Sequence, residues 1–227
     1  MKPFNRSCNL MLFTCALLVS ALLVAGTARA EQKAPTQKSD DKAVRHERAE
    51  LLNIPLVWKP TVTISSLGAI DLSAFQNAKI IVKPFTDLRL KPAEIGRNVE
   101  KRFTDKGLAV TTKDNVAAWL TDRFASILLE FDVPVVKEGG GMSIEADVLK
   151  FFVTEESTYK ADVGLKIRLR SKTGDVVWEG MIAVSNKRWG ASYKADNYYE
   201  LLSNSCIDVV QGLLKNDAFI QAVQKNK

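Results

Sequence analysis

An unbroken alternation of side-chain character from Tyr159 to Leu169 limits the fold more than any other feature of this sequence. The apolar or small positions are Tyr159, Ala161, Val163, Leu165, Ile167 and Leu169. The positions between them are mostly charged. A period of two over this length predicts a long β-strand with one dry face and one wet face. Similar segments flank it on both sides, so we expect it to be the middle strand of an antiparallel meander spanning about 142–187.

The strand before it, over 143–153, is expected to pair so that Val148 lies opposite Val163 and Glu145 lies opposite Lys166, with a turn over 154–157. Phe151-Phe152 breaks the alternation, which indicates a β-bulge. The third strand is expected to point four residues toward the core. These are Trp178, Gly180, Ile182 and Val184.

Two segments show the three- and four-residue spacing of amphipathic helices. The first stripe is Val116, Leu120, Phe124, Ile127, Leu128 and Phe131. The second is Tyr198, Leu202, Cys206, Val209 and Leu213. Short strands are expected near 78–84, 107–112 and 133–136. The fold class is therefore α+β: a two-layer sandwich of a mixed sheet, containing the meander, with two main helices packed on one face.

Residues 1–30 read as a secretory signal peptide: a positive start, an apolar run from Met11 to Ala25, and the small-x-small sequence Ala28-Arg29-Ala30. The apolar run is short for a membrane span, which needs about 20 apolar residues. We expect cleavage after Ala30 and a periplasmic location, with membrane association as the alternative. Residues 31–60 are polar and are predicted to be a tether, and 61–227 a single α+β domain.

Charge and cysteine content limit which partners and which covalent links the chain can have. Three of the six excess positive charges lie in the first thirty residues, so the rest of the chain carries +3, which does not favour nucleic acid as a partner. Cleavage after Ala30 would leave Cys206 as the only cysteine, so no intramolecular disulfide is expected. The basic row of the middle strand would suit an anionic lipid or glycan, but Glu145, Asp162 and Glu179 are expected to neutralise it.

Candidate contact residues lie in two loops. Lys187, Arg188, Trp189 and Tyr193 follow the third meander strand, and interfaces draw much of their energy from aromatic and arginine side chains. The alternative is that Trp189 folds back over the end of the core. In the second loop, Asp87 and Arg89 are two residues apart and would either clamp the loop as an ion pair or bind a ligand; the clamp is favoured.

The sequence contains none of the common catalytic or metal-binding motifs. There is no G-x-S-x-G elbow, no H-E-x-x-H, no Cys-His pair and no cluster with metal-ligand spacing, so neither an enzyme nor a cofactor is expected. Glu145, Asp147 and Glu179 could serve a carboxylate hydrolase, but they are predicted on the wet face of the sheet beside basic partners. A buried acid with a shifted pKa would favour that alternative.

The stretches I-I-V-K-P-F-T-D-L-R, D-N-V-A-A-W-L-T-D, R-W-G-A-S-Y and N-Y-Y-E-L-L-S-N resemble the YajG-like family of bacterial envelope lipoproteins, over roughly 78–223. That resemblance implies a non-enzymatic role in the cell envelope. The chain departs from the family because neither Cys8 nor Cys15 directly follows the apolar run, as a lipidation cysteine would.

The function expected from these observations is a periplasmic accessory or binding protein that contacts an envelope protein, with peripheral contact to membrane or glycan as a lesser option. Two alternatives stay open. The chain could carry a small apolar or lipid ligand between sheet and helices, which a large interior pocket would favour and a filled core would oppose. It could instead be the carboxylate hydrolase.

The cleavage site gives a direct test. The protein purified from the periplasm is expected to have the mass of residues 31–227 without a lipid, because the small-x-small sequence ends at Ala30 and the two early cysteines are removed with it. Intact-mass spectrometry measures this. A mass matching the whole chain, or one increased by acyl groups, would contradict the expectation.

Overall fold

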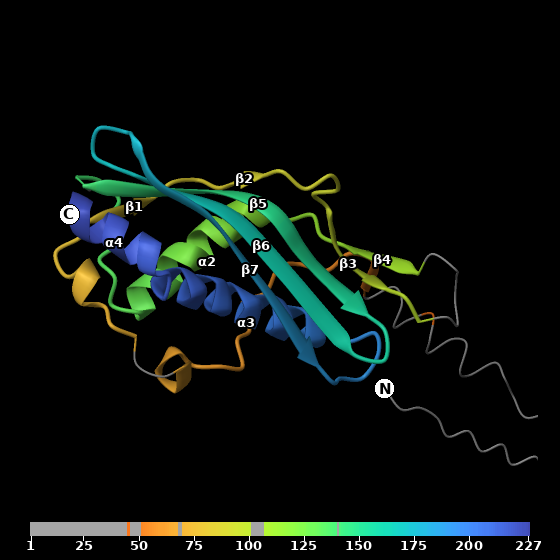
Figure 1. Ribbon diagram of the computed structural model, residues 1–227. Helices are drawn as coiled ribbons and strands as arrows, with labels where there is room; N and C mark the ends of the chain where they lie inside the picture. The colour runs from red at the N-terminus through yellow and green to blue at the C-terminus, as the bar shows by residue number, and fades with distance from the viewer. Residues whose placement is uncertain (1–44, 46–50, 68–69, 101–106, 140) are drawn as a thin grey trace, which may run out of the picture. The chain divides into compact units, whose positions relative to one another are not determined.

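The computed structural model describes residues 45, 51–67, 70–100, 107–139 and 141–227, all within the compact unit formed by residues 37–227. The predicted signal peptide and most of the predicted tether lie outside these residues. The meander is confirmed. It consists of β5 (Met142–Glu155), β6 (Tyr159–Arg170) and β7 (Val176–Arg188), paired antiparallel in that order. Figure 1 shows the three long strands side by side.

The other edge of β5 is occupied by three short strands that follow one another along it. They are β1 (Ile80–Val82), β2 (Thr86–Asp87) and β3 (Glu94–Asn98), all parallel to β5. β4 (Leu108–Thr111) pairs antiparallel with β3. The sheet is therefore mixed, as predicted. Together, β1, β2 and β3 pair with successive parts of the β5 edge that faces away from β6.

The predicted register of β5 against β6 was wrong by two residues. Val148 lies opposite Leu165 and Glu145 lies opposite Arg168. The turn is confined to residues 156–158, which shifts the register by three residues, and a bulge at Leu149 reduces the shift to two. This bulge shifts the register between Val148 and Lys150, two residues before the position suggested by Phe151-Phe152. The bulge changes which residues face the core. Even-numbered residues are buried up to Val148, and odd-numbered ones from Phe151 onward.

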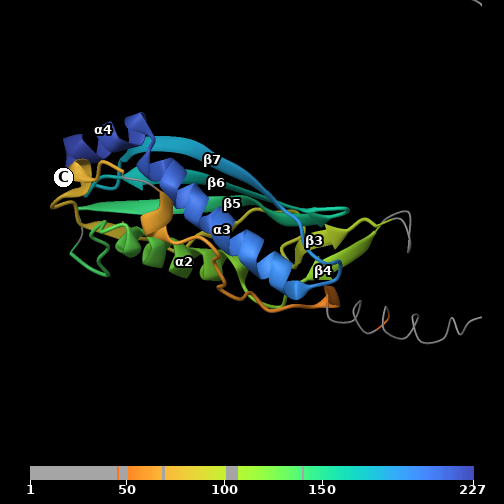
Figure 2. The ribbon, with the colours of Figure 1, turned by 90° about the horizontal axis from the view of Figure 1, so that it is seen from below.

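Helices α2 (Val116–Glu130) and α3 (Ala195–Leu214) cover one face of the sheet, as predicted (Figures 1 and 2). No helix of the described residues lies over the other face, which we call the helix-free face (Figure 2). Every residue of both predicted apolar stripes is buried. Asn115 caps α2, since its side chain accepts a hydrogen bond from Ala118 N at 3.0 Å. A third helix, α4 (Asp217–Asn226), packs near the start of β7.

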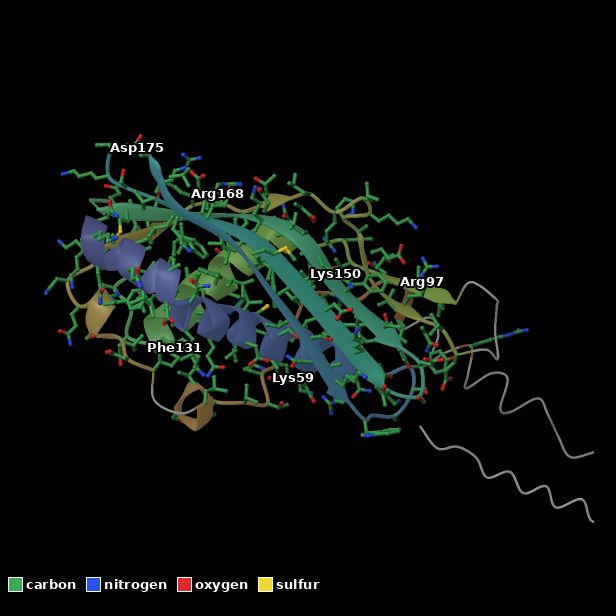
Figure 3. The ribbon with its side chains drawn as sticks, viewed as in Figure 1. Lys59, Arg97, Phe131, Lys150, Arg168 and Asp175 are labelled. Atoms are coloured by element: carbon green, nitrogen blue, oxygen red, sulfur yellow. The ribbon has the colours of Figure 1, made fainter. Side chains whose placement is uncertain are left out.

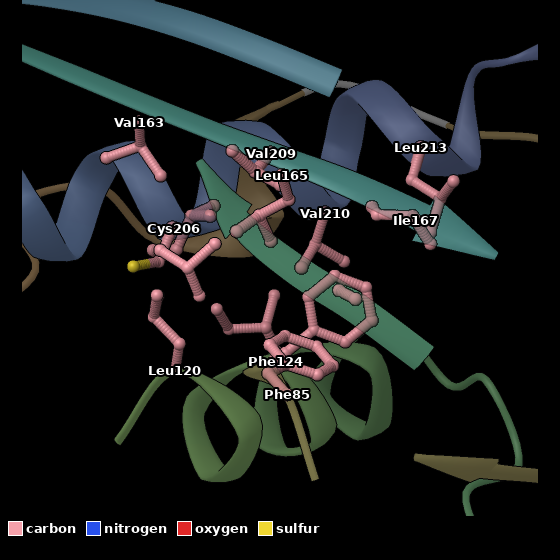
Figure 4. Close-up of a cluster of buried hydrophobic side chains, with 14 of the residues drawn as sticks. Phe85, Leu120, Phe124, Val163, Leu165, Ile167, Cys206, Val209, Val210 and Leu213 are labelled. Atoms are coloured by element: carbon pink, nitrogen blue, oxygen red, sulfur yellow. The ribbon is translucent and has the colours of Figure 1, made fainter. Parts of the chain in front are cut away.

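The core between sheet and helices is filled. Figure 4 shows Val163, Leu165 and Ile167 of β6 packed against α2 and α3 side chains, among them the buried Cys206. The void left among Leu120, Phe124, Val163, Leu165, Cys206 and Val209 measures about 10 Å³. A space of that size holds at most one water molecule. This part of the structure gives no support to a ligand carried between sheet and helices.

The packed domain begins earlier than the predicted boundary at residue 61. Leu51 and Ile54 are buried in the core, and Ile54 N donates a hydrogen bond to Thr111 O of β4 at 2.9 Å. Two short 3-10 helices, η1 (Ile64–Leu67) and η2 (Ser73–Phe75), follow. The part of the predicted tether from Leu51 onward belongs to the domain, because Leu51 and Ile54 are buried and Leu56 and Trp58 pack against the core.

Candidate functional site

The predicted contact loop begins where β7 ends. Trp189 is 77% exposed, so it does not fold back over the core. Arg188 is held by an ion pair with Glu200 of α3, and Lys187 is exposed. Tyr193 is buried, contrary to its prediction as a contact residue, and its backbone adopts a positive φ of 60°. Within this loop Trp189 and Lys187 are therefore exposed, while Tyr193 packs in the interior.

Tyr193 is anchored by a buried carboxyl that the sequence analysis missed. Glu155, at the end of β5, is fully buried. Its Oε1 accepts from Tyr193 N at 2.8 Å, and its Oε2 accepts from the Tyr198 hydroxyl at 3.1 Å. The Tyr159 hydroxyl lies 2.7 Å from Oε1. The carboxyl therefore ties the loop after β7 to β6 and to α3.

The surroundings of Glu155 act on the pKa of its carboxyl in opposite directions. The Tyr159 hydroxyl lies within hydrogen-bond distance of both Glu155 Oε1 and, at 2.8 Å, the Ala191 carbonyl, yet it has a single hydrogen. The Tyr159 hydroxyl therefore shares its hydrogen between these two acceptors. Burial raises the pKa of Glu155, and the nearby Glu100 raises it further, although the three hydrogen bonds oppose the shift.

Glu155 is the buried, shifted acid that would have favoured a hydrolase. Its position does not suit that role, because both oxygens are bonded within the protein and no part of the side chain reaches the surface. The other three acids that could serve a hydrolase form ion pairs on the helix-free face of the sheet. Asp147 binds Arg168 through two contacts of 2.8 and 2.9 Å, Glu145 binds Arg170 at 2.8 Å, and Glu179 binds Lys166 at 3.0 Å.

The pair Asp87–Arg89 forms the predicted clamp. Arg89 Nη2 lies 2.7 Å from Asp87 Oδ2, and its Nε lies 2.9 Å from Oδ1. The same guanidinium donates to the carbonyls of Pro92, Glu94 and Phe151. Burial alone would raise the pKa of Asp87, but the hydrogen bonds from Arg89 hold it below its usual value. This clamp fixes the loop between β2 and β3 against β5.

The two predicted groups do not form one site. Asp87 lies beside Val148 in the register, whereas the loop containing Tyr193 binds Glu155 at the far end of β5. At the usual strand rise these positions are roughly 20 Å apart.

A groove on the helix-free face lies beside the clamped loop. It has a volume of about 480 Å³. Its apolar lining comes from Leu88 and Leu90 of the clamped loop and from Leu149 and Phe152 of β5. Leu90 is fully exposed, and Leu88 is more than half exposed. We call this hollow the open-face groove.

A second hollow of about 260 Å³ continues the open-face groove across the sheet, since both are lined by Leu149 and Lys150. Its floor is low because the cross-strand pair Gly164 and Ala183 carries little or no side chain, and Met181 borders it with 65% exposure. Lys150 and Arg168 are labelled on this face in Figure 3. An apolar strip therefore crosses the sheet between ion pairs.

Positive charge predominates around the open-face groove. Arg89, Lys91, Arg97 and Lys150 line it, against Glu94 alone. Glu94 binds both Lys91 and Arg97, at 3.3 and 2.5 Å. Asp162, just outside, is shared by Lys150 and Lys160 at 2.9 and 3.2 Å. Asp87 and Asp162 lie beside the groove and pair with its cations. When these two acids are counted with Glu94, the lysine and arginine side chains still outnumber the acids.

Sequence reasoning missed the open-face groove because its apolar residues are far apart in the chain. The one available signal was the run Leu149-Lys150, where the alternation of β5 has to change and a leucine is left on the polar face. Within the described ranges, no group of three or more His, Cys, Asp or Glu residues could hold a metal ion, and no helix is long and apolar enough to cross a membrane.

No family model matches the chain, and no curated protein sequence does so either. Similar solved structures include a Xanthomonas campestris protein described as DUF330, with 13% identity and a TM-score of 0.49 over 77% of this chain and 99% of that one. A lipoprotein from Neisseria meningitidis has 13% identity and a TM-score of 0.32, over 48% and 83%. A putative lipoprotein from Caulobacter crescentus has 12% identity and a TM-score of 0.37, over the same shares. All three TM-scores are below 0.5.

The Glu155 cluster predicts a specific pH dependence. Because the pKa of Glu155 is raised on folding, the protonated form stabilises the folded state, and that contribution is lost as pH rises from about 4.5 through the folded pKa. The free energy of unfolding of the wild type, measured relative to Glu155→Gln, should therefore fall over that window. The loss is about 1.4 kcal/mol per pH unit between the unfolded and folded pKa values.

Urea titrations at several pH values provide the measurement, and Glu156→Gln, in the exposed turn, is the control for loss of a carboxyl. A difference that instead grows with pH would show that Glu155 is ionised and stabilising in the folded protein.

Proposed function

We propose that this chain is a non-enzymatic accessory protein of the bacterial cell envelope that binds an acidic, apolar segment of another envelope protein in the open-face groove. The observation that supports this most directly is the exposure of Leu88, Leu90 and Leu149 around one hollow. Exposed apolar side chains scattered singly are normal, but a contiguous group framed by polar residues marks an interaction site.

The chemistry of the partner follows from the lining. Leucine and phenylalanine side chains favour an apolar segment, and the surplus of lysine and arginine favours acids beside it. The groove walls are held in place before binding, since Arg89 ties the loop that carries Leu88 and Leu90 to β5. A preformed site loses less conformational entropy when its partner binds.

The envelope location rests on the signal-peptide features of residues 1–30 and on the resemblance to the YajG-like family. Trp189 offers a second contact point. It is exposed, and the strand that precedes it and the Glu155 cluster behind it fix the position of its loop.

In-cell photo-crosslinking tests whether a partner contacts the open-face groove or another part of the surface. A photoreactive amino acid at Leu90 should capture a distinct envelope protein, while the same group at Leu129, which is exposed on α2, should not. With the photoreactive group moved to Leu88, which lines the same groove, Leu90→Arg should weaken capture at least tenfold and leave the melting temperature unchanged, since the Leu90 side chain is fully exposed. Leu129→Arg is the matched control.

Capture from Trp189 but not from Leu90 would contradict the groove as the contact site and move it to the loop after β7. Equal capture from Leu90 and Leu129 would contradict a specific contact. Capture of lipid alone at Leu90 would replace the protein partner with a membrane surface.

A further inference from the structure

The free edge of β7 is the least protected feature of the described structure. β7 is 13 residues long and lies at the end of the strand order, and no strand among the described residues pairs with its outer edge. It contains no proline, and no bulge interrupts it after Trp178. An unpaired edge of this length is a template for another strand, and natural proteins usually block such edges.

The core-facing side chains of β7 are less buried than those of β6. The residues of β6 that face the helices are all buried. The corresponding residues of β7, Trp178, Ile182 and Val184, are only partly buried although they face the same core. No strand of the described residues lies beyond them, and a strand added at this edge would increase their burial.

We propose that β7 pairs antiparallel with β7 of a second copy of this chain, about a two-fold axis at Ala183. In this register Ala183 lies opposite its own counterpart, Ile182 lies opposite Val184, and Glu179 lies opposite Lys187. Every pair joins residues on the same side of the sheet, as antiparallel pairing requires. The symmetry produces each of the last two contacts twice.

Charge selects this register over its neighbours. Glu179 and Lys187 are both exposed on the outer face of β7. A shift of two residues one way would place Lys187 opposite Val177, and a shift the other way would place it opposite Met181. Only the register centred on Ala183 puts the acid opposite the base, and directly opposed charges of opposite sign stabilise a strand pair, whereas like charges destabilise it.

The inference goes beyond the proposed function, because it concerns another surface and a different partner. The two sheets would join into one, with their helix layers on the same face. Met181 and Ala183 border the hollow that extends the open-face groove, so the strips of the two copies would approach each other near the axis.

Charge reversal tests the pairing on the purified protein. Sedimentation equilibrium should show a dimer. Lys187→Glu and Glu179→Lys, each alone, should weaken it roughly tenfold or more, because each places like charges at two symmetric positions. An equimolar mixture of K187E and E179K should restore dimerisation, since opposite charges then meet at both positions. Lys113→Glu, an equal charge change away from β7, should have no effect.

Cysteine crosslinking tests the register independently of charge. Ala183→Cys should form an intermolecular disulfide on mild oxidation, because directly opposed residues have Cα atoms about 4.5–5.5 Å apart. Ser185→Cys should not, because its counterpart would lie well beyond disulfide reach. The native Cys206 is buried and should not take part.

A monomer at all concentrations would overturn the proposal, as would a dimer that K187E and E179K leave unchanged. Failure of the mixture to recover, or equal disulfide formation at residues 183 and 185, would overturn the register. None of these results depends on the partner of the open-face groove, so the two proposals can fail separately.

Discussion

The structure depends on a change in the side-chain alternation of β5 at Leu149. Before this residue the buried positions are even-numbered, and after Lys150 they are odd-numbered. A regular strand would turn Phe151, Val153 and Glu155 toward solvent, because a slip of one residue moves every side chain to the opposite face. The bulge keeps both halves of β5 on the core. It also leaves Leu149 and Lys150 together on the helix-free face, where they line the open-face groove.

The two faces of the sheet consequently have different roles. The helix-covered face is filled and, with Glu155 locking its far end, leaves no room for a ligand among the residues shown in Figure 4. The helix-free face carries ion pairs that hold their charges in fixed positions, such as Arg168 with Asp147. Asp147 raises the pKa of Arg168 further above its ordinary value. Between these pairs lies the apolar strip that we propose for binding.

The sequence predicted the parts of the fold that have a sustained period. The alternation of β6 and the stripes of α2 and α3 were enough to establish the meander, the helix layer and the fold class. The register failed because residues 154–157 are all polar and do not reveal where the turn lies. β2 and β3 were missed because they are too short for a period, and residues 133–136 form only an isolated bridge between Ile80 and Val135. The clamp of Asp87 and Arg89 was predicted because its members are neighbours, whereas the open-face groove joins distant segments.

Deletions in β5 test the central claim about the bulge most directly. Removing Leu149 alone leaves Val148 inward, Lys150 outward and Phe151 inward, which is a regular strand. Removing Leu149 and Lys150 together turns every later residue of β5 the wrong way. Thermal and urea unfolding should show that the single deletion still unfolds cooperatively, within about 2 kcal/mol of the wild type, because it preserves all buried contacts of the strand. The double deletion should not fold. A double deletion that folds as stably as the single one would contradict the account.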